Sequence, residues 1–117
     1  MIDFKMLKKA DINCQNGLAR FANNLEIYEE NLNRFVEDKH YYDLKKAYKK
    51  NDLEEMKYHA RVLEDMSGTL ELTKIYNHSS KLKSALKNNS GKKVDRYMEL
   101  LAPAYEDAVS IIKDALI

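Results

Sequence analysis

The side chains in this sequence with the most versatile chemistry are three histidines and one cysteine. The histidines are His40, His59 and His78, and the cysteine is Cys14. An imidazole exchanges protons near neutral pH, attacks phosphoryl groups and binds metal ions. His59 opens the stretch HARVLEDMSGTLEL, residues 59–72, which has the outline of a helical segment that presents a reactive histidine at a protein surface.

The other candidates for chemistry have no partners in the sequence. No set of His, Cys, Asp and Glu residues has the spacing of a zinc site, so we expect neither a metal nor a cofactor. The lone Cys14 cannot form an internal disulfide, which fits a reducing cytoplasm. His40 is expected at the surface near a helix end, and His78 is expected to be exposed within a helix.

Composition narrows the class of protein. Apolar residues make up 44% of the chain and charged residues 33%, so the chain can bury a core and cover it with charge. Twenty basic and nineteen acidic residues leave a net charge of +1, which does not favour a nucleic-acid partner. No apolar run approaches the roughly 20 residues needed to span a bilayer, and the charged start is unlike a signal peptide. We therefore expect a cytoplasmic protein without a membrane contact.

Apolar residues recur at spacings of three and four through most of the chain, as in amphipathic helices. Asn51 or Asp52 is expected to cap the central helix, and KNNSGKK, residues 87–93, is the clearest loop. Pro103 is expected to kink or divide the last helix. Helices are predicted over residues 3–10, 17–24, 25–40, 41–51, 53–70, 71–87 and from about 94 to 115. The predicted fold is all-α: a single domain, residues 1–117, forming an antiparallel four-helix bundle with a short N-terminal helical cap.

The order of these segments resembles the histidine-containing phosphotransfer (HPt) domain family over nearly the whole chain. The stretch GLARFANNLEIYEENLNRFVED is similar to the family's opening, and NDLEEMKYHARVLEDMSGTLEL is similar to its central helix. In that helix an aspartate leads, nine residues later, to the phosphoaccepting histidine. The resemblance implies an HPt-like bundle and a place in two-component phosphorelay signalling. Four positions agree with the motif: Asp52, Leu63, Ser67 and Leu70.

The resemblance breaks down where the chemistry belongs. Arg61 stands where the phosphoaccepting histidine is expected, Glu64 where a lysine is expected, and Asp65 where a glycine is expected. Glu71 occupies the second glycine position. Arginine cannot act as the nucleophile because its guanidinium stays protonated. We therefore predict that phosphoryl transfer is absent and that the protein is not an enzyme.

His59 is a weak substitute for the missing histidine. Two residues of helix turn the side chain by about 200°, so His59 and Arg61 face different directions. Sliding the alignment by two residues would expose Leu63, although Ala60 and Leu63 must face inward together. We expect His59 to be partly buried at a helix boundary.

The outward side of the central helix is the predicted partner-binding surface. Arg61 is expected there to pair with Glu64 and Asp65. A solvated helix face explains the pattern equally well. The functional interpretation is a docking face for the receiver domain of a response regulator or hybrid histidine kinase, on a monomer that carries no phosphate. An active carrier that uses His59 and a structural helical module are the alternatives. The predicted surface consists of Lys57, Tyr58, Arg61, Glu64, Asp65 and Gly68.

Overall fold

The computed structural model describes residues 3–116, and residues 1, 2 and 117 of the expected domain lie outside the described part. Those described residues are helical, with no strand beyond an isolated β-bridge between Ile12 and Leu72. The all-α prediction is therefore confirmed. The helices are α1 (Phe4–Lys9), α2 (Cys14–Arg20), α3 (Leu25–Glu37), α4 (His40–Lys49), α5 (Leu53–Leu70), α6 (Thr73–Lys87) and α7 (Gly91–Ala115).

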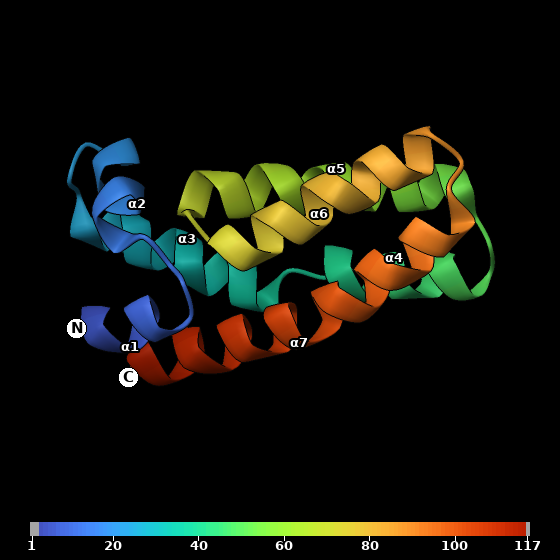
Figure 1. The fold of residues 1–117 in the computed structure, drawn as a ribbon. Coiled ribbons are helices and arrows are strands. Elements are labelled where there is room, and N and C mark those ends of the chain that lie inside the picture. The colour runs from blue at the N-terminus through green and yellow to red at the C-terminus, as the bar shows by residue number, and fades with distance from the viewer. Residues whose placement is uncertain (1–2, 117) are drawn as a thin grey trace.

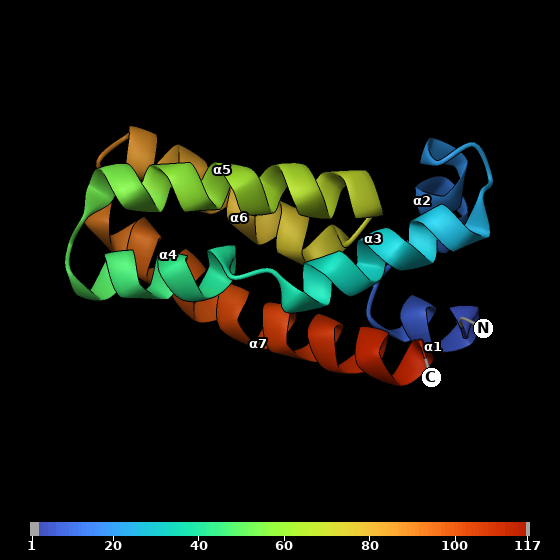
Figure 2. The ribbon, with the colours of Figure 1, turned by 180° about the vertical axis from the view of Figure 1, so that it is seen from behind.

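The helices form an elongated body of 42 × 23 × 20 Å (Figure 1). Helix α5 packs against α4 on one side and α6 on the other, and α6 packs against α7. Helices α3 and α4 follow one another along one edge, separated by a short extended link (Figure 2). Helix α1 lies beside the end of α7, where the Asp3 N–H donates to the Ala115 carbonyl at 3.0 Å.

The reversals between the long helices depend on single residues with left-handed backbones. Asn51, Glu71 and Asn89 have φ angles of 54°, 60° and 53°. Asparagine tolerates this conformation well, whereas it is strained for glutamate. Each reversal is short, which places α4, α5, α6 and α7 next to one another in chain order.

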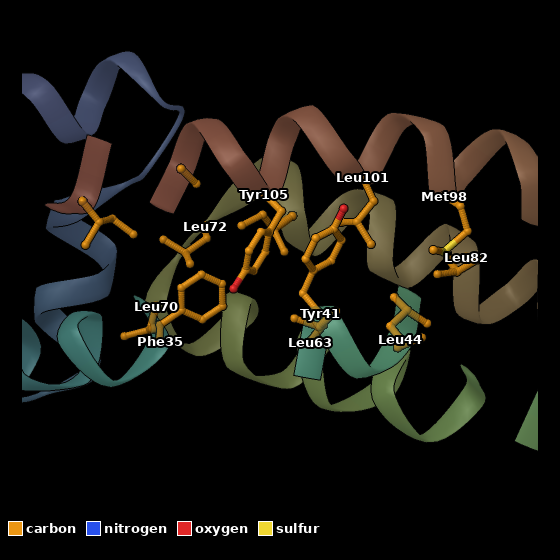
Figure 3. Close-up of a cluster of buried hydrophobic side chains, with 14 of the residues drawn as sticks. Phe35, Tyr41, Leu44, Leu63, Leu70, Leu72, Leu82, Met98, Leu101 and Tyr105 are labelled. Atoms are coloured by element: carbon orange, nitrogen blue, oxygen red, sulfur yellow. The ribbon is translucent and has the colours of Figure 1, made fainter. Parts of the chain in front are cut away.

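One cluster of buried side chains runs through the long helices (Figure 3). At its centre the rings of Tyr41 on α4 and Tyr105 on α7 are stacked, with centres 4.1 Å apart. Phe35 on α3 packs against Tyr105 as well, at 5.7 Å. These aromatic contacts join both helices of the interrupted edge to α7.

Sequence patterns located most helix boundaries, with two corrections. Asp52 caps α5 by accepting from the Glu55 N–H at 3.2 Å, as predicted. The predicted loop at 87–93 is shorter, because α7 already begins at Gly91. Pro103 does not divide α7, which continues from Gly91 to Ala115. Both Pro103 and Glu99, four residues earlier, are exposed, so water can solvate the carbonyl that loses its bond.

Candidate functional site

Helix α5 is the scaffold of the candidate site, and its sequence explains why it begins and ends where it does. Asp52 caps its first turn, and Glu54 and Glu55 lie where the helix dipole favours negative charge. At its end Glu71 adopts the left-handed cap conformation. The Leu72 N–H then donates to the Ser67 carbonyl at 2.8 Å, which closes the helix.

The side chains of Tyr58, Arg61 and Asp65 together form what we call the outer face of α5. They recur at spacings of three and four, and all three are exposed. Tyr58 is 47% exposed. Arg61 and Asp65 make no ion pair with any residue in the range 3–116, so the predicted pairing between them is not formed. The outer face therefore presents an uncompensated cation beside an uncompensated carboxylate.

Two further members of the predicted surface flank the outer face. Lys57 is half-buried, and its Nζ lies 3.4 Å from Glu54 Oε1. Gly68 is half-buried against the ring of Tyr76 on α6. A Cβ at position 68 would lie 3.0 Å from that ring, so the absence of a side chain is explained by helix packing.

Glu64 corrects the sequence-based prediction. It is buried and faces α6 rather than solvent, and its Oε1 lies 2.6 Å from Lys83 Nζ. The predicted partner Arg61 forms no ion pair with Glu64 within residues 3–116. The spacing of charges along α5 predicted an exposed pair with Arg61. The actual counter-ion is Lys83 on α6, 19 residues away in the sequence.

The histidine next to the outer face is buried. His59 is 8% exposed and lies in the second turn of α5, not at a helix boundary as expected. Its Nδ1 is 2.9 Å from His40 Nδ1, and its Nε2 is 3.3 Å from Glu55 Oε2. His40, at the first position of α4, is half-buried by this contact. His59 Nδ1 therefore has a hydrogen-bond partner, and its Nε2 lies near a carboxylate.

Two shallow grooves border the outer face at its Asp65 end, and neither is lined by Tyr58 or Arg61. The groove toward α6 has a volume of about 450 Å³ and is mainly polar. The groove toward α3 has a volume of about 340 Å³ and includes Phe35, Met66 and Leu70. Asp65 and Thr69 line both grooves, so this end of the outer face offers a partner both charged and apolar contacts.

The remaining reactive side chains lie away from this face. His78 on α6 is half-buried rather than exposed, and burial, with Lys81 and Lys74 nearby, lowers its pKa. Burial raises the pKa of the Cys14 thiol, which makes it less reactive. Within residues 3–116, no group of three or more His, Cys, Asp and Glu side chains is arranged to hold a metal ion. No helix in that range is both long and apolar enough to cross a membrane.

Comparison with known proteins identifies no relative of this chain. The chain matches no protein-family model, no curated protein and no solved structure.

Two features of the site were missed by sequence reasoning. The contact between His40 and His59 joins positions 19 residues apart across the reversal at Asn51. The presence of one histidine on each of two consecutive helices joined by a short reversal is a signal that could have suggested the contact. The bond between Glu64 and Lys83 crosses the reversal at Glu71, but many lysines of α6 were equally plausible partners.

Proposed function

We propose that this chain is an HPt-like protein that binds the receiver domain of a response regulator or hybrid histidine kinase without accepting a phosphoryl group. The proposal rests on which side chains of α5 are exposed and which are buried. Arg61 is exposed at the position where the resemblance puts the phosphoaccepting histidine, whereas His59 is 8% exposed. The face keeps a position suited to docking and lacks a nucleophile.

The arrangement of helices supports the HPt-like part of the proposal. Under this proposal α3 with α4, α5, α6 and α7 are the four members of the bundle, and α1 with α2 are the cap. The resemblance expects a glycine at the end of the central helix, and Glu71 there has a φ of 60°. Glycine adopts that conformation freely, so the backbone retains what the family sequence implies even though the residue has changed.

The surroundings of His59 support the second part of the proposal, that the chain accepts no phosphoryl group. A phosphoaccepting imidazole needs a free nitrogen aimed at its partner. His40 occupies Nδ1 of His59, and Glu55 Oε2 lies 3.3 Å from Nε2. An active carrier that used His59 would have to break both contacts and turn the ring out of the protein.

The outer face suits an acidic partner surface. A guanidinium binds a carboxylate through two parallel hydrogen bonds, and Arg61 has no such partner within the described chain. Tyr58, one turn earlier, supplies an exposed ring of the kind enriched at binding hot spots. In this proposal Arg61 meets the acidic pocket around the receiver's own aspartate, and Tyr58 packs beside it.

A binding assay with charge-reversed variants tests the proposal. Purified receiver domains from the source organism are titrated with the wild type, with Arg61→Glu and with Arg96→Glu. Arg96 is exposed on α7, which makes no contact with α5, so it provides the same charge change elsewhere. We expect binding to be lost with Arg61→Glu and kept with Arg96→Glu. Absence of binding to every receiver, or equal effects of the two variants, would contradict the proposal and favour a structural module.

A further inference from the structure

The rings of His40 and His59 meet beside the outer face, between α4 and α5. Their ring centres lie 5.1 Å apart and their Nδ1 atoms 2.9 Å apart, a difference of 2.2 Å (5.1 − 2.9). That difference is close to the sum of the two ring radii, so the nitrogens lie almost on the line between the ring centres. This is the geometry of an N–H···N hydrogen bond. Two ligands of one metal ion would instead converge on a point beside that line.

The proton positions follow from the neighbours. Glu55 Oε2 lies 3.3 Å from His59 Nε2, which favours a proton on Nε2 and leaves Nδ1 as an acceptor. His40 Nδ1–H is then the donor. One additional proton can join the other nitrogen of His40 and leave this bond intact. A second additional proton would put N–H groups on both facing Nδ1 atoms, and two cations would then oppose each other.

The pair is mechanically connected to the outer face through Tyr58. The Tyr58 ring lies 5.0 Å from the His59 ring and 5.7 Å from the His40 ring, both edge-on. His59 is fixed inside α5, whereas His40 follows the extended link at Asp38 and starts α4. Separation of the rings would therefore displace His40 and remove one of the two walls against which Tyr58 packs.

Charged groups of both signs lie near the pair. Besides Glu55 on α5, Asp38 Oδ2 accepts from the His40 backbone N–H at 2.8 Å. Asp43 lies in the first turn of α4, and the basic neighbours in the sequence are Lys39 before His40 and Lys57 and Arg61 on either side of His59. On α7, Tyr105 is close enough to Asp38 for that carboxylate to help raise its pKa. The opposing Nδ1 atoms disfavour the second additional proton.

We propose that His40 and His59 form a proton-sensitive clasp that holds Tyr58 in place on the outer face and opens when both imidazoles are protonated. Imidazoles ordinarily titrate between about pH 5 and 8, so acidification opens the clasp and a return to neutral pH closes it. The clasp stands on the described geometry alone. Its effect on receiver binding rests on the proposed function.

Nuclear magnetic resonance of the imidazole and tyrosine side chains tests the clasp directly. In the wild type we expect His40 and His59 to titrate in two separated steps. A strongly downfield Nδ1–H proton should persist through the first step and disappear in the second, when the Tyr58 ring signals shift. His78 on α6 should titrate alone and serves as the internal reference. Independent titration of the pair, or a Tyr58 ring that ignores the second step, would overturn the clasp.

Two variants separate the clasp from folding defects and from the docking function. His40→Gln keeps a side-chain amide but removes one titrating ring, so the low-pH shift of Tyr58 should vanish, while His78→Gln should leave it unchanged. Receiver binding should weaken during the second protonation step in the wild type and not in His40→Gln. Two titration steps with no receiver binding at any pH would refute the docking function alone. Binding that stays constant with pH, without separated steps, would refute the clasp alone.

Discussion

The substitution Glu64→Lys should destabilise the protein by about 2–4 kcal/mol, although helix-wheel reasoning would place position 64 on a tolerant surface. Glu64 is 9% exposed and bonded to Lys83, whose side chain is 42% exposed. Loss of such a half-buried pair should cost about 1–2 kcal/mol, between the values for exposed and buried pairs. The new lysine would then face Lys83. Two like charges about 4 Å apart repel by up to about 4 kcal/mol at an intermediate dielectric, and part of this is relieved because Lys83 can turn toward water.

Urea unfolding followed by far-ultraviolet circular dichroism measures this effect. Glu64→Gln should lose only the pair, about 1–2 kcal/mol, and Glu64→Lys should lose more. The double variant Glu64→Lys with Lys83→Glu should recover most of the loss, because the pair is restored with its charges exchanged. A Glu64→Lys protein within about 0.5 kcal/mol of wild type would place the residue at the surface and refute the burial argument.

The same contact determines how phosphoryl acceptance could be introduced if the proposed function is correct. Arg61→His alone should give little, because Asp65 obstructs and Glu64 stays negative. The family-like triple change adds Glu64→Lys and Asp65→Gly, but it would also oppose Lys83 with a second cation. Only a fourth change, Lys83→Glu, keeps the helix pair α5–α6 stable while the imidazole is introduced.

Three further substitutions test the packing and the backbone. Gly17→Ala should cost about 1–3 kcal/mol in urea unfolding, because a Cβ would lie 2.7 Å from the Tyr28 hydroxyl, whereas Gly91→Ala, with open space around its Cβ, should be neutral or slightly stabilising. Glu71→Gly should be about 1 kcal/mol more stable than Glu71→Ala in thermal unfolding, since only glycine relieves the left-handed φ of 60°; equal stabilities would argue against that strain. Burial raises the pKa of Tyr105 to about 12, so its neutral form is favoured in the folded state and stability should fall as pH rises from about 10 toward 12. Tyr105→Phe should flatten that alkaline loss, and an unchanged pH profile would contradict the burial effect.

Local patterns predicted the helices well because they depend on neighbours in sequence. The apolar residues of α5 recur at three and four, and Asp52 caps the helix by itself, so both its start and its inward side followed from the sequence. The extended link between α3 and α4 did not, because the predicted helices at 25–40 and 41–51 were contiguous and Asp38 and Lys39 are ordinary helix-compatible residues. Tertiary contacts, including the stacking of Tyr41 on Tyr105, accompany that break and place α4 against α5 and α7.

The candidate site was predicted in part for the same reason. Exposure of Arg61 and Asp65 followed from the helical period, and so did the inward direction of Leu63. Burial of Glu64 did not follow, because it depends on a cation from α6. The depth of burial of His59 likewise depends on a ring from α4. Sequence periodicity assigns a side chain to a sector of its helix, and the neighbouring helix decides whether that sector is solvent.

The most direct test of the central claim measures phosphate on histidine. A receiver domain carrying a radiolabelled phosphoryl group on its aspartate is incubated with the wild type and with His59→Ala, and the products are divided by their stability to acid. We expect no acid-labile label on either protein, because the exposed position holds a guanidinium and the buried imidazole of His59 faces His40 and Glu55. Acid-labile label on the wild type that disappears in His59→Ala would show that His59 accepts the phosphoryl group and that the protein is an active carrier.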